Sequence, residues 1–230
     1  MSELYLVRHA QASFGAANYD QLSELGHRQS RWLGDYLKQR KIEFDCFVVG
    51  DMHRHHQTMD GISAGLAVDT SDRLVIPGLN EYDFHNIVEV YSDNHADDPL
   101  LDRIQQDPTD TKSHHRLLRK ALTLWAKGQL PEVAETWIEF RARLQSAQQQ
   151  IQSLADSRRR ILAIGSGGSI SAFVGTVLDI PDENIFDLNL QYRNTAISHF
   201  YLDSKKLSLS SFNGLPHLDT NEMAQFITYS

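Results

Sequence analysis

The stretch Glu3-Leu4-Tyr5-Leu6-Val7-Arg8-His9-Ala10-Gln11-Ala12-Ser13 opens with an apolar run rich in strand-forming residues and then changes abruptly to Arg-His and small residues. This pattern predicts a buried strand whose carboxyl end delivers polar side chains into a crevice, the edge where open α/β sheets bind ligands. Arg8 carries a planar cationic fork suited to phosphate oxygens, and a neutral His9 is a usable nucleophile near pH 7. By itself Arg-His is more often a solvated strand end, so its meaning depends on the rest of the chain.

Apolar runs alternate with helical patterns through the first third of the chain. Ser23 is the expected N-cap of a first helix, and Phe44 to Val49 is a second strand. A second helix is predicted from near Arg54 to about Ala64, followed by a short third strand from Arg73 to Ile76. This β-α-β-α-β order favours a parallel sheet with helices on both faces.

Between about residues 84 and 157 the alternation stops, which predicts a helical insertion that caps the crevice. Asp93 to Ser113 is polar and acid-rich, so we expect a loop or short helix there and a substrate that is not very highly charged. Pro131 is expected in the first turn of a long amphipathic helix, whose apolar residues from Trp137 to Leu154 are spaced three and four apart.

The alternation resumes with a fourth strand, Arg160 to Ile164, which leads through the turn Gly165-Ser166-Gly167-Gly168-Ser169 into a further helix. Ala196 to Leu202 and Leu207 to Phe212 are expected to form a final hairpin. We therefore expect an α/β fold of three layers, α/β/α, with a mostly parallel sheet and a helical insertion capping the active-site edge. Residues 1–230 are expected to form a single domain.

The charge and cysteine content limit the partners and the compartment. The 230 residues include 22 Lys and Arg against 30 Asp and Glu, a net charge of -8, which disfavours nucleic acid and membrane surfaces as partners. The single cysteine, Cys46, is expected in the core and fits a reducing compartment. The N-terminus enters a strand directly, and no apolar run approaches membrane-spanning length. We expect a cytoplasmic protein.

Groups suited to a phosphate ester follow four successive predicted strands. Arg8 and His9 follow the first, and Arg54 opens the helix after the second, where free N–H groups favour an anion. Glu81 follows the third strand, and the glycine-rich turn around Ser166 follows the fourth. A nucleophile, cations, an acid and backbone donors thus converge on one edge of the predicted sheet.

With these residues in place, the chain resembles the histidine phosphatase superfamily, the relatives of cofactor-dependent phosphoglycerate mutase. Leu6-Val7-Arg8-His9-Ala10 is similar to the family's Arg-His-Gly signature, and Arg54-His55-His56-Gln57-Thr58 is similar to its Arg-x-x-Gln-Thr motif. Further stretches that resemble the family are Leu22 to Gln29, Leu79 to Phe84, Phe140 to Arg143, Asn194 to Ile197 and Asn213 to Leu218.

The resemblance implies a phosphatase that hydrolyses a small phosphate monoester through a phosphohistidine. In that reading His9 attacks phosphorus, Arg8 and Arg54 hold the phosphoryl oxygens, and Glu81 protonates the leaving oxygen and then activates water. No metal and no cofactor are implied, because two arginines can neutralise the charge of a phosphoryl transition state. The substrate is the implied partner, and the oligomeric state stays open.

Two residues depart from the family pattern. Ser166 stands where the family has a second histidine, and the loss of one such transition-state donor costs about 3 kcal/mol, or about a hundredfold in rate. A serine hydroxyl still donates, and the backbone N–H groups of Gly167 and Gly168 can offset part of the loss. Ala10 replaces a glycine in the first motif, which adds one methyl group to the pocket.

Other functions stay open on the sequence alone. A mutase needs the same residues and differs only in retaining the phosphoryl group until the product exchanges position. A weakly active or inactive phospho-ligand-binding module is consistent with Ser166. A third reading makes Ser166 itself the nucleophile of a strand-turn-helix elbow, although Ile164 stands where that motif has its first glycine.

Individual residues also have alternative roles. Asp83 competes with Glu81 for the acid role, and Arg54 can instead pair with Asp51 or Asp83. His217 either borders the pocket or caps a turn. The remaining histidine clusters suggest a metal only weakly, since adjacent histidines point apart on a helix; these residues are His53, His55, His56, His114 and His115.

Overall fold

The computed structural model describes residues 1–13, 20–203 and 205–229, and six strands of this part form one sheet in the order β3-β2-β4-β1-β5-β6. Neighbours among β1, β2, β3 and β4 run parallel, whereas β5 is antiparallel to β1 and to β6, which confirms a mostly parallel sheet. The strands are β1 (Ser2–Arg8), β2 (Cys46–Val49), β3 (Leu74–Val75), β4 (Arg160–Gly165), β5 (Ile197–Leu202) and β6 (Leu207–Gly214).

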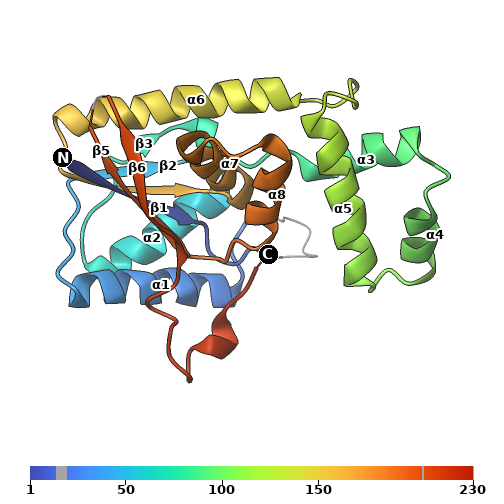
Figure 1. The fold of residues 1–230 in the computed structure, drawn as a ribbon. Helices are drawn as coiled ribbons and strands as arrows, with labels where there is room; N and C mark the ends of the chain where they lie inside the picture. The colour runs from blue at the N-terminus through green and yellow to red at the C-terminus, as the bar shows by residue number, and fades with distance from the viewer. Residues whose placement is uncertain (14–19, 204, 230) are drawn as a thin grey trace.

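Helices cover both faces of the sheet, as a three-layer α/β/α fold requires. In Figure 1, α1 and α2 lie on one face and α6 and α7 on the other. The α-helices are α1 (Glu24–Gln39), α2 (His53–Leu66), α3 (Phe84–Asn94), α4 (Pro99–Gln106), α5 (Thr111–Ala126), α6 (Trp137–Ser153), α7 (Gly167–Leu178) and α8 (Asp182–Leu190). The 3-10 helices are η1 (Pro77–Leu79), η2 (Leu154–Asp156) and η3 (Ala224–Phe226).

The alternation of side chains along β1 explains why the sheet needs two helical layers. Leu4 and Leu6 join the core under α6 and α7, whereas Val7 joins the core under α1 and α2. All three side chains are fully buried. A strand that is apolar on both faces has to be covered on both, which is typical of parallel sheets. Cys46 is buried at the start of β2, as expected.

The first residues of α1 and α6 can be compared with the helix starts expected from the sequence. Ser23 is the N-cap of α1, as predicted, and its side chain accepts a hydrogen bond from the Gly26 N–H. The prediction for Pro131 is wrong, because α6 begins at Trp137, six residues later. Thr136 and Glu139 form a capping box there, in which each side chain accepts from the other's backbone N–H. This box decides where the helix starts.

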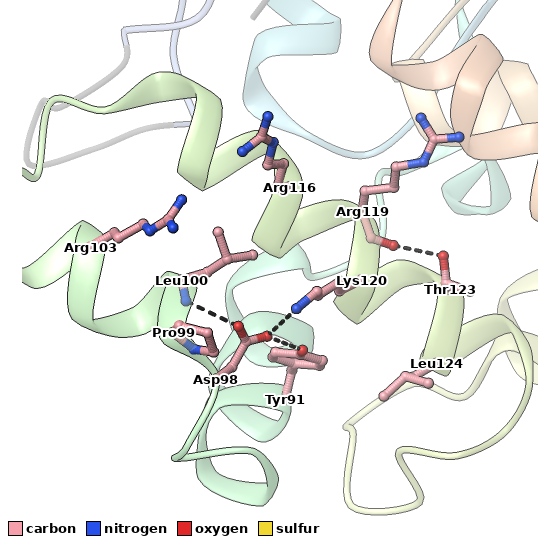
Figure 2. Close-up of a pocket in the computed structure, with 10 residues that line it drawn as sticks. All are labelled: Tyr91, Asp98, Pro99, Leu100, Arg103, Arg116, Arg119, Lys120, Thr123 and Leu124. Atoms are coloured by element: carbon pink, nitrogen blue, oxygen red, sulfur yellow. Dashed lines mark hydrogen bonds and ion pairs between the residues drawn. The ribbon is translucent and has the colours of Figure 1, made fainter.

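Of the expected insertion, α3, α4 and α5 lie beyond the carboxyl ends of the strands in Figure 1, whereas α6 lies along one face of the sheet. Within the acid-rich stretch, α4 is the short helix and Asp98 is its N-cap. The Asp98 carboxylate accepts from Tyr91 Oη at 2.6 Å and from Lys120 Nζ at 2.7 Å. Burial raises the pKa of Asp98, but hydrogen bonds from Lys120 and Tyr91 outweigh it and lower that pKa to about 2. Figure 2 shows this group.

A hollow of about 660 Å³ lies between α4 and α5. Arginine side chains surround the hollow in Figure 2, and of these only Arg103 belongs to the acid-rich stretch from Asp93 to Ser113. None of the site residues predicted from the sequence lines it. The cations that line it are Arg103, Arg116, Arg119 and Lys120. Among the described helices, none is long and apolar enough to span a membrane.

Candidate active site

The sheet order brings the predicted site residues to one edge. β1 and β4 are parallel neighbours with Arg8 opposite Gly165, so His9 and Ser166 leave adjacent strand ends side by side. The His9 N–H still donates to the Gly165 carbonyl at 2.9 Å. β2 lies on the other side of β4 and leads to Arg54 on the first turn of α2.

His9 is held as a neutral imidazole. Its Nδ1 lies 2.8 Å from the Ala10 carbonyl oxygen, which places the proton on Nδ1 and the lone pair on Nε2. Arg54 Nε–H donates to that Nε2 at 3.2 Å. Burial and the positive charges of Arg54 and Arg8 hold the pKa of His9 well below its usual value. The side chain is therefore uncharged and nucleophilic near neutral pH.

The His9 ring is shielded from solvent in the structure. His9 is only 2 % exposed, and each ring nitrogen has a hydrogen-bond partner. The partner of Nε2 is the guanidinium that a phosphoryl oxygen would attract. Attack from Nε2 therefore requires Arg54 to release the imidazole, and a charge-assisted bond from its guanidinium to an anion would be the stronger of the two.

Arg54 is positioned by a carboxylate that the sequence analysis did not single out. Its Nη1 donates to Asp20 Oδ1 at 3.0 Å, so the partner is Asp20 and not Asp51 or Asp83. The other Asp20 oxygen accepts from the His53 N–H at 2.9 Å, which satisfies a free donor at the start of α2. Asp20 lies 33 residues before that helix, and no local spacing signals the pairing.

Arg8 lies beside the start of α7. A Cβ at Gly167 would sit 3.3 Å from both Cζ and Nε of Arg8, so the absence of a side chain there makes room for the guanidinium. Arg8 Nη1 donates to the backbone carbonyls of Tyr192 and Tyr229. These bonds fix Arg8 where a helix N-terminus and a guanidinium can face the same anion.

Glu81, and not Asp83, faces this helix N-terminus. Its Oε2 accepts from the Gly168 N–H at 3.1 Å, whereas Asp83 caps α3 by accepting from the Asn86 N–H. Arg143 of α6 holds the loop that carries Glu81, with hydrogen bonds to the carbonyls of residues 78, 80 and 81. The carboxylate is thereby kept at the edge of the site.

Ser166 is fully buried at the N-terminus of α7 and contacts a histidine. Its Oγ lies 2.8 Å from His55 Nε2, and the His55 ring centroid lies 5.7 Å from that of His9. From the sequence, the only separate role suggested for His55 was that of a weak candidate metal ligand. The described residues contain no group of three or more His, Cys, Asp or Glu side chains that could hold a metal ion. The sequence feature that could have pointed to His55 as a site residue is its position directly after Arg54.

The remaining candidates lie around this group. Ala10 is fully buried, and its N–H donates to Thr58 Oγ1 at 3.0 Å, so the extra methyl is accommodated. His217 Nε2 lies 2.9 Å from Thr195 Oγ1, and burial lowers the pKa of His217 to about 3. The backbone N–H of Thr195 donates to the Arg8 carbonyl. His217 is therefore linked to Arg8 through Thr195.

Comparisons with known proteins identify the family and the fold of the chain. The family model of the histidine phosphatase superfamily (branch 1) matches residues 4–214. No curated protein sequence matches the chain. A phosphoserine phosphatase variant from Entamoeba histolytica, solved with phosphoserine, has a similar structure with a TM-score of 0.65 and 17% identity, covering 95% of this chain and 100% of its own.

Two further solved structures share the fold at similar levels. A phosphoglycerate mutase from Bacillus anthracis gives a TM-score of 0.67 at 16% identity, over 98% of this chain and 96% of its own. An alpha-ribazole phosphatase from Shigella flexneri gives a TM-score of 0.61 at 18% identity, over 92% of this chain and 96% of its own. At these identities the likeness establishes the fold.

Proposed function

The chain belongs to the histidine phosphatase superfamily (branch 1), and we propose that it is a phosphatase that hydrolyses a small phosphate monoester through a phosphohistidine on His9. The observation that carries the proposal is the 3.2 Å contact between His9 Nε2 and Arg54 Nε. The contact brings the His9 lone pair and the Arg54 guanidinium together, which supports the proposed roles of nucleophile and oxyanion-binding cation. The neutral state of His9 supports the same role, since a protonated imidazole has no lone pair for attack.

In the first step, His9 Nε2 forms a bond to phosphorus and the bond from phosphorus to the ester oxygen breaks. Arg8 and Arg54 neutralise the phosphoryl oxygens, which is the main requirement of this transition state. The Gly167 N–H at the start of α7 and the Ser166 hydroxyl add donors for the same oxygens. Protonated Glu81 gives its proton to the leaving oxygen.

In the second step, Glu81 takes a proton from water while the water oxygen attacks phosphorus and the bond to Nε2 breaks. Inorganic phosphate and neutral His9 result, and the proton on Glu81 restores the starting state. A mutase would instead return the phosphoryl group to its product. Both kinds of enzyme occur among the similar structures, so the acceptor has to be measured.

We place this reaction in the cytoplasm. The single buried cysteine, Cys46, fits a reducing compartment. The substrate we propose is a small phosphorylated molecule, and the proposal includes reduced activity because Ser166 lacks the charge of the second histidine.

Release of inorganic phosphate from a panel of phosphate monoesters tests the proposal. The panel includes p-nitrophenyl phosphate, phosphoserine and 3-phosphoglycerate, and the protein variants are His9→Gln and His53→Gln. His53 is exposed on the same helix as Arg54 and serves as the matched control. We expect hydrolysis by the wild type and His53→Gln and none by His9→Gln. Equal hydrolysis by His9→Gln would overturn the role of His9.

A further inference from the structure

His55 and Ser166 form a buried pair beside the proposed nucleophile. Both side chains are completely inaccessible to solvent, and His55 Nε2 lies 2.8 Å from Ser166 Oγ. The His55 and His9 rings are tilted by 34° with centroids 5.7 Å apart. Ser166 follows β4 and His9 follows the parallel neighbour β1, so both leave the sheet at the edge where we propose that a phosphoryl group meets His9.

The space for this imidazole comes from Gly50 at the end of β2. A Cβ at Gly50 would lie 2.3 Å from His55 Nδ1 and 2.8 Å from His55 Cε1, far inside van der Waals contact. His55 is thus enclosed by Gly50 on one side and by Ser166 on the other. Its ring cannot turn away from Ser166 without moving one of these segments.

The protonation of His55 sets the direction of the Ser166 hydroxyl. When Nε2 carries a proton, it donates to Ser166 Oγ, and the hydroxyl proton is free to point at a phosphoryl oxygen. When Nε2 carries the lone pair instead, the Ser166 hydroxyl donates its proton to the imidazole, and only the lone pairs of Oγ face the anion. The first arrangement stabilises a phosphoryl group on His9, and the second repels it.

We propose that His55 is a positioning residue that donates from Nε2 to Ser166 Oγ and so directs the Ser166 hydroxyl as a hydrogen-bond donor to the phosphoryl group on His9. His55 on α2 and Ser166 at the start of α7 would then together supply the hydrogen bond to the phosphoryl group that a histidine at position 166 would supply alone. This inference rests on the proposed phosphohistidine reaction.

The charges around His55 are consistent with this role. Burial and the charges of Arg54 and His56 hold the pKa of His55 well below its usual value and outweigh the opposite effect of the Gly50 backbone, so the ring is neutral. His9 is neutral as well, as described above. A phosphoryl dianion adjacent to Ser166 favours a proton on the side of the ring that faces it. Binding of the anion and donation from Nε2 therefore support one another.

Steady-state kinetics on a double-mutant cycle test the pair. We expect His55→Ala and Ser166→Ala each to lower kcat by about a hundredfold with little change in KM, because the donor acts mainly in the transition state. The double variant should be no slower than either single one. His53→Ala should keep wild-type kcat. Losses that multiply in the double variant, or a wild-type kcat in folded His55→Ala, would overturn the pairing.

Conservative variants keep the inference testable if alanine at position 55 unfolds the protein. His55→Gln retains an N–H that can donate to Ser166, and Ser166→Thr retains the hydroxyl. Both should recover at least tenfold in kcat over the alanine variants. Ser166→His should be poorly active in the wild-type background because His55 occupies its space, and the added change His55→Ala should restore activity. If the glutamine and threonine variants are as slow as alanine, the proposal is wrong.

Imidazole nitrogen spectra give a readout that does not need turnover. With inorganic phosphate or vanadate bound, we expect a proton on His55 Nε2, with the signal identified by its loss in His55→Gln. A lone pair on Nε2 in that complex would contradict the inference even in an active enzyme. Failure of the proposed function has a different signature, namely no phosphate release by the wild type. A phosphoryl adduct on Ser166 would instead make His55 a base and overturn the inference.

Discussion

Substitution of Gly168 by alanine displaces the proposed acid, Glu81, without replacing any charged residue. The Gly168 N–H donates to Glu81 Oε2, and the missing side chain lets two residues approach the helix. A Cβ at this position would lie 2.2 Å from Glu81 Oε1 and 2.3 Å from Tyr82 Cε1. Ordinary contact begins near 3.4 Å, so each group has to withdraw by about 1 Å.

A displacement of about 1 Å at a reacting group costs about a hundredfold in rate, equivalent to about 3 kcal/mol in the barrier. We therefore expect Gly168→Ala to lower kcat/KM by about a hundredfold for an alkyl phosphate, whose leaving oxygen needs a proton. The loss in the phosphorylation step should be smaller for p-nitrophenyl phosphate, whose leaving group departs without one. The comparison separates a misplaced acid from a general loss of binding.

The matched control is Gly214→Ala, where the added Cβ would lie 3.7 Å from the Ile197 carbonyl oxygen, in ordinary contact. It should keep wild-type activity. Circular dichroism establishes that both variants are folded, and Glu81→Gln supplies the reference profile. In a Glu81→Gln background, Gly168→Ala should cause little further loss with the alkyl substrate. A folded Gly168→Ala enzyme with wild-type kcat/KM on that substrate would refute the reasoning.

Three further predictions follow from other contacts. The pKa of His217 is about 3 in the folded protein against 6.5 in the unfolded chain, so the unfolded chain binds more protons below pH 6.5. As the pH falls below 6.5, His217 therefore lowers the free energy of unfolding by up to about 1.4 kcal/mol per pH unit, and His9 and His55, whose pKa values are also lowered, add to this slope with the same sign. Urea titrations from pH 7 to 5 check this, and His217→Gln should reduce the slope. Asp98→Ala removes the N-cap of α4 and the acceptor for Tyr91 and Lys120, so it should cost about 2 kcal/mol in urea unfolding while kcat stays unchanged. Arg143→Lys retains the charge but loses the planar guanidinium that donates to three backbone carbonyls, including that of Glu81. The Glu81 loop should then be held less firmly, so kcat should fall about tenfold with KM unchanged. An unaltered kcat would contradict the proposal that Arg143 positions Glu81.

The sheet was predictable because its signal is local. Each parallel strand is a short apolar run that ends in polar or small residues, and β1 carries the Arg-His pair directly at its end. The start of α6 was misplaced because Pro131 and Thr136 are both acceptable helix starts by composition. Only the reciprocal contacts of Thr136 with Glu139 decide between them. Helix α8 (Asp182–Leu190) was not predicted from the sequence.

The site was predictable to the extent that strand ends converge. Arg8 ends β1, and His9, Arg54 and Glu81 come after strands, so the topology alone collects them at one edge. Asp20 and His55 were missed because their roles depend on tertiary contacts. Asp20 reaches Arg54 from 34 residues away, and His55 finds Ser166 across 111 residues. No periodicity or spacing encodes such pairs.

Trapping the phosphoenzyme tests the central claim most directly. The protein is mixed with a phosphate monoester, quenched within milliseconds, and its intact mass and phosphopeptides are measured after treatment with acid or with alkali. We predict a single phosphoryl adduct on His9 that acid removes and alkali spares, absent from His9→Gln. An acid-stable adduct on Ser166, or steady hydrolysis with no adduct on His9, would contradict the account.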